Sequence, residues 1–329
     1  MNKCYKTSVL DAGGRYGLHP SWKPFTGELE YYLFEPDPVE SKRLEQKYSR
    51  RSDEVKVVGR AVAEKNGKLT IHFFKNRAMS SASVRNPVSS LFKGERLREV
   101  DIVESIEVEA VSIDSFCETN NLSLDFLKLD TEGSEFDILQ GAKKQLQENI
   151  LGVRCEVSFD YIFDGMPLFS TVHDFMLSQG FYLLNLDYDG RGDYQNDFVK
   201  ISDKYGILTA SDAVWMKRPT HLLERPRCLS AGTEARVMKY AAFCINNGAC
   251  DVALDILLKA RHEQGMNFDA LKDTRLYKFL DISIHKLFYG LKWQPGQSLK
   301  AHQEVFSDIF GKKMKEMNEF MESEDLNPD

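Results

Sequence analysis

Three short apolar runs in the sequence each end at an acidic residue and a turn. The acidic residues are Asp11 after residues 7–10, Glu35 after residues 30–34, and Asp130 after residues 126–129. β-prone runs of this length that alternate with helical segments are typical of a mostly parallel sheet covered by helices on both faces. Ligands of such sheets bind outside the carboxyl ends of the strands, so we expect the three acidic residues around one site.

The rest of the first 218 residues continues this strand–helix alternation. Further strands are expected at residues 55–58, 68–74, 108–113, 153–157, 181–186 and 213–216. Helices are expected from Pro38 toward Tyr48, at residues 136–146 and at 168–179, with Asp114 capping another short helix. Residues 68–74 alternate in the β manner after the Asn66-Gly67 turn, which suggests an antiparallel insertion, and Pro20 and Pro24 predict a short first crossover helix.

After about Pro219 the pattern becomes helical only. Helices are expected at residues 233–246, 251–262, 274–287 and 301–321. The sequence thus predicts two domains, an α/β domain at residues 1–218 and an α-helical extension at residues 219–329. We expect the extension to bury sheet surface or to form a homodimer; a platform for substrate or partner is the alternative.

Composition and charge exclude several classes of protein. The chain is 42% hydrophobic and 28% charged, which is typical of a globular protein. Its net charge of −7 gives no overall attraction for nucleic acid or anionic lipid, and we expect no nucleic-acid partner. The six cysteines form no Cys-x-x-Cys pair. No apolar run reaches the roughly 20 residues of a membrane span, and no signal peptide is recognisable, so we expect a cytoplasmic protein.

The turn at residues 11–17, Asp-Ala-Gly-Gly-Arg-Tyr-Gly, suits a ligand that touches the backbone, because glycine permits tight turns and close approach. A dinucleotide site would carry Gly-x-Gly-x-x-Gly, but Ala12 replaces its first glycine and Asp11 would repel phosphates. Glu35 follows Asp11 by 24 residues, near the roughly 20-residue spacing at which a carboxylate meets a ribose diol. The structural alternatives are a simple bend and a carboxylate that complements a helix dipole.

The block Lys-Leu-Asp-Thr-Glu-Gly-Ser-Glu at residues 128–135 crowds carboxylates at the end of an apolar strand. Such crowding shifts pKa values and can supply a general base or a metal ligand. A capping box is the structural alternative. In it, Asp130 or Thr131 would be the N-cap residue, and the side chain of Glu135 or Ser134 would bond back to the amide of that residue. Both interpretations can hold together.

Together these blocks resemble the FkbM family of S-adenosylmethionine-dependent methyltransferases. The resemblance covers about residues 8–217 and rests on DAGGRYG at 11–17, FEPDP at 34–38 and LKLDTEGSEFDILQGA at 127–142. It implies a class I Rossmann-like methyltransferase fold, S-adenosylmethionine as cofactor, and methylation of a hydroxyl on a sugar, a glycolipid or another secondary-metabolite or polysaccharide precursor. It also implies that Asp11, Gly13 and Gly17 hold the methionine end, Glu35 the ribose, and Ala61 and Val62 the adenine edge. Further cofactor-binding candidates are Gly14, Pro36 and Asp130.

A hydroxyl acceptor benefits from a general base, for which Asp130 and Glu132 are the favoured candidates and His19 is the third. We expect no metal; the alternative is a divalent ion on Asp130 and Glu156, with Asp187 as a third candidate ligand. The basic residues between positions 77 and 98 suit either an acidic sugar carrier or a solvated loop; they are Arg77, Arg85, Lys93, Arg96 and Arg98.

Two other functions stay open. A strand, a glycine turn and an acid are also the layout of an NAD(P)-dependent oxidoreductase. A catalytically silent binding module, with the helical extension supplying the function, is the second alternative.

Overall fold

The structure is a computed structural model that describes residues 5–51, 54–86, 89, 96–187, 190–192, 207–223 and 232–290 of the 329-residue chain. It divides into two compact units. The larger unit holds Lys6–Trp22 and Leu29–His221, and the smaller one groups Met1–Tyr5 and Lys23–Glu28 with the chain from Leu222 onward. The predicted domain limits, 1–218 and 219–329, remain a prediction.

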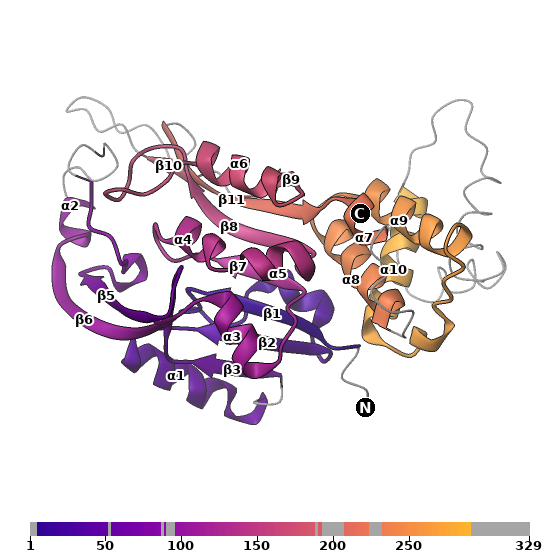
Figure 1. The fold of residues 1–329 in the computed structure, drawn as a ribbon, viewed down its shortest axis with the longest axis horizontal. Helices are drawn as coiled ribbons and strands as arrows, with labels where there is room; N and C mark the ends of the chain where they lie inside the picture. The colour runs from indigo at the N-terminus through magenta and orange to yellow at the C-terminus, as the bar shows by residue number, and fades with distance from the viewer. Residues whose placement is uncertain are drawn as a thin grey trace. The chain divides into compact units, whose positions relative to one another are not determined.

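The larger unit is built on a sheet of eight strands among the described residues, in the order β10-β11-β8-β7-β1-β2-β3, with β9 beside β11 (Figure 1). The strands are β1 (Thr7–Ala12), β2 (Leu29–Phe34), β3 (Val55–Val58), β7 (Phe126–Leu129), β8 (Gly152–Ser158), β9 (Phe181–Leu186), β10 (Gly190–Gly192) and β11 (Ile207–Lys217). Strands β3, β2, β1, β7 and β8 run parallel to one another, and β11 runs antiparallel to β8. The predicted Rossmann-like α/β class, with a mostly parallel sheet, is confirmed.

Helices cover one face of this sheet. They are α3 (Ile113–Asn120), α4 (Glu135–Gln140), α5 (Lys143–Glu148) and α6 (Phe169–Ser178). Ile113, Leu139 and Met176 of these helices share a core with Leu10 and Leu129 of the central strands, and each is fully buried. Burial of such a side chain contributes roughly 1.5–3 kcal/mol, so this face carries much of the stability of the unit.

The opposite face is covered by α1 (Pro38–Tyr48), which η3 (Ser49–Arg51) continues, and by Trp22 of the 3-10 turn η2 (Pro20–Phe25). The Trp22 ring lies 5.5 Å from that of Phe126, and the Tyr48 hydroxyl accepts a hydrogen bond from the Leu18 amide at 2.8 Å. The predicted shortening of the first crossover is confirmed, since only a 3-10 turn forms between β1 and β2.

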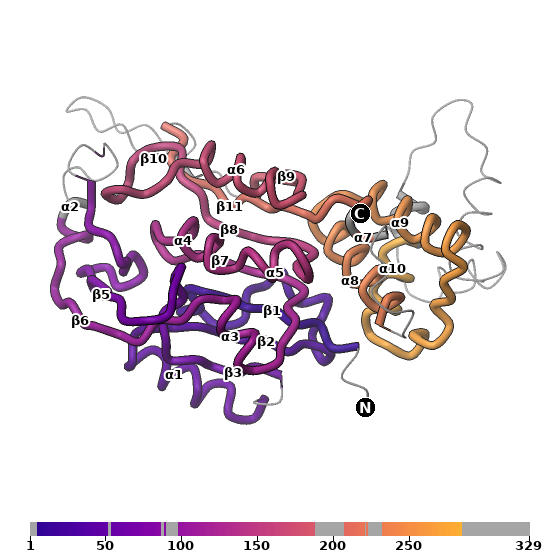
Figure 2. Tube along the Cα trace, viewed as in Figure 1, coloured from indigo at the N-terminus to yellow at the C-terminus, as the bar shows by residue number. Residues whose placement is uncertain are grey.

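A second, three-stranded sheet is inserted between β3 and α3, as the tube in Figure 2 traces. It consists of β4 (Ala61–Val62), β5 (Gly67–Phe74) and β6 (Ile102–Val111), with the short elements η4 (Arg77–Met79) and α2 (Arg96–Glu99) between β5 and β6. The predicted antiparallel pairing is confirmed for β5 and β6. β6 is longer than expected and ends before Ser112, because the Ser112 hydroxyl caps α3 through the Ser115 amide.

Two local predictions were wrong. Asp114 does not cap α3; its carboxylate accepts hydrogen bonds from the Lys144 and Gln145 amides at the start of α5. The single helix expected at residues 136–146 is two helices, broken at Gly141. A Cβ on Gly141 would lie 2.6 Å from the Ala63 carbonyl oxygen, so the insertion approaches the backbone at this break.

The smaller unit is helical in its described part after residue 222. Beyond α7 (Pro219–Leu223), its elements are α8 (Gly232–Asn246), α9 (Cys250–His262), η5 (Asp269–Leu271) and α10 (Arg275–Gly290). Both carboxylate oxygens of Glu28 accept amide hydrogen bonds at the start of α10, from Arg275 at 2.8 Å and Leu276 at 3.1 Å. The helix predicted at residues 301–321 lies outside the described residues. No helix of the described chain has both the length and the apolar character needed to cross a bilayer.

The turns after β1 and β7 lie in direct contact. Gly13 has φ +90°, and a Cβ placed on it would lie 1.7 Å from the Asp130 carbonyl oxygen. In addition, the Asp130 amide donates to the Ala12 carbonyl at 3.0 Å. Only glycine permits this approach, which brings the two acidic turns together.

Gly13→Ala is therefore expected to destabilise the protein far more than Gly165→Ala. Gly165 also has a left-handed φ, +71°, but open space around its Cβ position. Its substitution costs only the left-handed penalty of about 1–2 kcal/mol, whereas Gly13→Ala adds a backbone collision costing at least about 2 kcal/mol more. Urea unfolding midpoints would measure both. Equal losses would contradict the contact.

Candidate functional site

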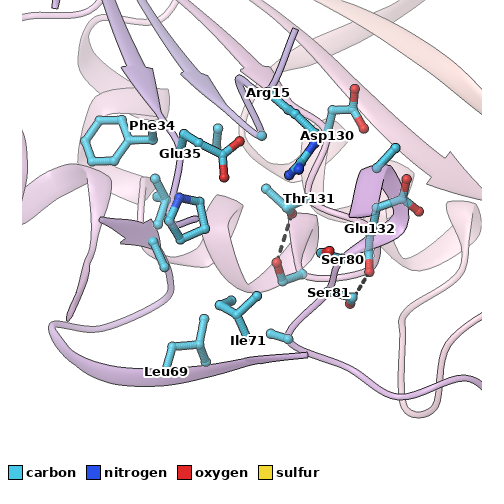
Figure 3. Close-up of a pocket in the computed structure, with 18 of the residues that line it drawn as sticks. Arg15, Phe34, Glu35, Leu69, Ile71, Ser80, Ser81, Asp130, Thr131 and Glu132 are labelled. Carbon is cyan, nitrogen blue, oxygen red and sulfur yellow. Dashed lines mark hydrogen bonds between the residues drawn. The ribbon is translucent and has the colours of Figure 1, made fainter. Parts of the chain in front are cut away.

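A cavity opens at the carboxyl ends of β1, β2 and β7, and the inserted sheet forms its far wall (Figure 3). The β1, β2 and β7 ends contribute Gly13, Glu35 and Asp130. The other lining residues are Ala12, Arg15, Tyr16, Phe34, Pro36, Arg60, Ala61, Val62, Leu69, Ile71, Phe73, Arg77, Ala78, Ser80, Ser81, Ala82, Thr131, Glu132 and Ser134. The cavity thus has an apolar wall on β4 and β5 and a charged wall on the strand ends.

Most predicted cofactor residues line this cavity. Those that do are Gly13, Glu35, Pro36, Ala61, Val62 and Asp130. The structure does not place Asp11, Gly14 or Gly17 among the lining residues. A Cβ on Gly14 would meet Leu33 at 2.4 Å, and one on Gly17 would meet the Tyr48 hydroxyl at 2.3 Å. These two glycines therefore give room for packing behind the turn.

Glu35 is the buried carboxylate of the cavity. It follows the last residue of β2, its side chain points into the cavity (Figure 3), and its Oε1 accepts a hydrogen bond from the Asp37 amide at 2.9 Å. Burial raises its pKa to about 7, against the lowering effects of that amide and of Arg15. Such a carboxyl can accept hydrogen bonds from a ligand's hydroxyls and loses little solvation on doing so.

Asp11 lies behind the cavity in an internal ion pair. The Tyr31 hydroxyl donates to its Oδ2, and Lys128 Nζ lies 3.3 Å from its Oδ1. The same ammonium lies 3.2 Å from Asp130 Oδ2. Burial raises the pKa of Asp11, and Lys128 opposes that shift. Lys128 therefore connects a fully buried acid with one that faces the cavity.

The loop from Thr131 to Gly133 is organised by the buried carboxylate of Glu135. That carboxylate accepts hydrogen bonds from the Thr131 amide at 2.6 Å, the Thr131 hydroxyl at 2.9 Å and the Gly133 amide at 3.0 Å. Glu132 between them has φ +59°, and its carbonyl accepts a hydrogen bond from the Ser81 hydroxyl. The Glu135 carboxylate thus holds the loop amides, but the predicted capping box does not form, because Ser134 is the N-cap of α4 and makes no side-chain cap hydrogen bond. The loop also lines the cavity.

Glu132, Asp130 and Glu156 form an acidic cluster on this side. One oxygen from each lies within 4.8 Å of the others, so these three residues have the spacing to hold a divalent ion. Burial, then the charges of Asp130 and Glu135, raise the pKa of Glu132 to about 8. Asp187, the third ligand considered from the sequence, pairs instead with Arg154 at 2.6 Å.

His19 does not line the cavity. Its Nδ1 accepts a hydrogen bond from the Ser21 amide at 3.3 Å. Burial, together with the charges of Lys128 and Arg154, lowers its pKa to about 4. The ring is therefore neutral near pH 7.

The sequence did not reveal the inserted wall of the cavity. Leu69, Ile71 and Phe73 alternate along β5 and line it, but the same alternation is typical of any half-buried strand. Arg77, predicted as a candidate for an acidic carrier, instead pairs with Asp37 at 3.1 Å and Glu104 at 2.9 Å. Lys93 and the side chain of Arg96 lie outside the described residues.

Residues 13–183 match the family model described as "Methyltransferase FkbM domain", which is just over half of the chain. The chain belongs to the FkbM methyltransferase family. The comparison with curated proteins found no significant match. The match covers the acidic cluster and all cavity-lining residues except Ala12, whereas β1, β10, β11 and the chain from Leu222 onward lie outside it.

Among solved structures, the chain is similar to an FkbM methyltransferase from Methylobacillus flagellatus KT, at 15% identity and a TM-score of 0.38. The similarity covers 64% of this chain and 43% of that one, so the chain spans less than half of that protein. The N-terminal domain of human METTL16, solved in complex with SAH, has 11% identity and a TM-score of 0.31, covering 66% of this chain and 64% of that one. A human methyltransferase 10 domain containing protein has 10% identity and a TM-score of 0.29, with 64% and 72% covered.

Lys128→Met is expected to destabilise the FkbM domain by about 3–5 kcal/mol at pH 7, because it leaves Asp11 buried without its cation. The pKa of Asp11 then rises further, so the variant loses stability as pH rises above the unfolded-state pKa and recovers part of it toward pH 4. Urea unfolding across pH would show this. Adding Asp11→Asn to Lys128→Met should restore stability at pH 7; no recovery in the double variant would contradict the pairing.

The substitution Glu132→Gln tests the raised pKa of the Glu132 carboxyl group. With a folded pKa of about 8 above its ordinary 4.5, Glu132 contributes stability below pH 4.5 that is lost as pH rises through 8. The Gln variant lacks this loss, so between pH 5 and pH 8 the wild type should lose roughly 2–4 kcal/mol relative to it. Glu118→Gln, an exposed residue on α3, is the control. Parallel pH curves for wild type and Glu132→Gln would refute the assignment.

Proposed function

We propose that this protein is an S-adenosylmethionine-dependent O-methyltransferase whose acceptor is a hydroxyl on a sugar, a glycolipid or a related precursor. The observation that carries the proposal is the placement of Glu35 in a cavity with an apolar wall on one side and a glycine turn on the other. Membership of the FkbM family supports it.

The lining residues fit the parts of this cofactor. The Glu35 carboxylate suits the two ribose hydroxyls, since one carboxylate can accept from both. Val62, Leu69 and Phe73 offer an apolar surface for the flat adenine ring. Gly13 lets the backbone approach the amino-acid end. Asp11 supports this end from behind, through Lys128 and Asp130.

When bound, S-adenosylmethionine supplies a methyl group on a positively charged sulfur. The chain's own contribution is to position the acceptor oxygen and to take its proton. Asp130 lies 3.2 Å from Lys128 Nζ and lines the cavity, where its oxygens are placed to orient a hydroxyl. Glu132, with a pKa of about 8, titrates near working pH and is the general base in this proposal. His19 is the weaker candidate because it lies outside the cavity lining.

The charge near Asp130 favours a neutral, hydroxyl-rich acceptor. Asp130, Glu132 and Glu156 all present carboxyl oxygens there, which accept hydrogen bonds from hydroxyls and provide no positive charge for an anionic group. A sugar ring offers several such hydroxyls. An acidic sugar would have to place its charge away from this cluster.

Glu35→Gln should weaken binding of S-adenosylhomocysteine by about 10- to 100-fold, the value of one or two hydrogen bonds to a charged group. Isothermal titration would measure it. Glu30→Gln, on the same strand but paired with Lys56, is the matched control and should bind as the wild type does.

Titration with NADH distinguishes the proposed methyltransferase from the alternative, an NAD(P)-dependent oxidoreductase. Tight NADH binding by a wild type that ignores S-adenosylhomocysteine would overturn the methyltransferase proposal in favour of that alternative. An equal loss in Glu30→Gln and Glu35→Gln would remove Glu35 from the ligand site.

A further inference from the structure

Arg15 places a positive charge inside the cavity with few partners. It lies on the turn after β1, and Figure 3 shows its guanidinium between Glu35 on one side and Asp130 and Thr131 on the other. Both terminal nitrogens of its guanidinium lie 3.5 Å from Asp37 Oδ2, the outer limit of a hydrogen bond, and its side chain is 21% exposed. A guanidinium has five N–H donors, and within the described part of the chain both terminal nitrogens share this one distant acceptor oxygen.

The Asp37 carboxylate has other hydrogen-bond and ion-pair partners besides Arg15. Its Oδ1 accepts hydrogen bonds from the Val39 and Glu40 amides at the start of α1, at 3.0 and 3.4 Å. Its Oδ2 is held more closely by Arg77, at 3.1 Å. Arg15 can therefore turn toward a ligand while Asp37 keeps its other partners.

Arg77 provides the contrast, because it lines the same cavity with its charge already used. It forms ion pairs with Asp37 and with Glu104, and its guanidinium lies 4.6 Å from the centre of the Phe73 ring. These contacts tie the inserted sheet to α1. The two arginines thus differ in how many of their N–H donors are already engaged by protein acceptors. Donors that are not engaged are available to an anion.

We propose that Arg15 binds the carboxylate of the amino-acid end of the cofactor. This inference rests on the proposed function. The carboxylate is the one anionic group of S-adenosylmethionine, and a planar guanidinium matches it in bidentate geometry. Arg15 lies on the same turn as Gly13, at the end of the cavity assigned to the amino acid, whereas Arg60 adjoins Ala61 at the adenine end.

The experiment compares two ligands that differ in the amino-acid end. S-Adenosylhomocysteine carries the carboxylate, and 5′-methylthioadenosine lacks it. Isothermal titration of the full chain should show that Arg15→Gln weakens S-adenosylhomocysteine binding by about 10- to 100-fold and changes 5′-methylthioadenosine binding by less than about threefold. Retained 5′-methylthioadenosine binding also shows that the variant is folded.

Arg15→Lys keeps the charge but not the planar fork, and should recover part of the loss. Arg77→Gln is the control, which should affect both ligands to the same extent. Equal weakening of both ligands by Arg15→Gln, or no weakening of either, overturns the inference while leaving the proposed function in place. A wild type that binds neither ligand overturns the proposed function and this inference with it.

Discussion

The site depends on one buried ammonium. Lys128 extends from β7 between Asp11 and Asp130 and lies within about 3.3 Å of both. Without it, the chain would bury the Asp11 carboxylate beside a second carboxylate, Asp130, with no counter-charge, and an unpaired buried charge is among the most costly arrangements in a protein interior. With it, the end of β1 and the end of β7 form one electrostatic unit. Asp130 lines the cavity, and Lys128 links Asp11 to it.

The pairing of Lys128 with Asp11 and Asp130 also shows which parts of the site could be predicted from the sequence and which could not. The strand ends could be predicted, because short apolar runs before Asp11, Glu35 and Asp130 fix both the register and the edge at which the acids gather. The sequence could not show that Asp11 points into the protein and Glu35 into the cavity. That difference depends on Tyr31 and Lys128, which lie 20 and 117 residues from Asp11 along the chain.

The inserted sheet was harder to predict in detail. The Asn66-Gly67 turn indicated an antiparallel insertion, and the antiparallel pairing of β5 with β6 confirms it, whereas β4, the strand before this turn, pairs in parallel with β6. Its role as a cavity wall depends on packing between segments distant in sequence, such as the approach of Ala63 to Gly141. The helix expected at residues 136–146 is interrupted at this same residue, Gly141. Local propensity gave the right class of element there, and tertiary contact decided its length.

The hydrogen bond from Ser81 to the Glu132 carbonyl has a consequence for how this fold can diversify. It fastens the inserted segment to the loop that holds the acidic cluster, and the backbone of Ser81 is itself bridged to His72 on β5. The two parts cannot be exchanged independently. A chimera that imports another relative's insertion to change acceptor preference must carry a hydroxyl at this position, or the loop will lose the anchor for its left-handed residue.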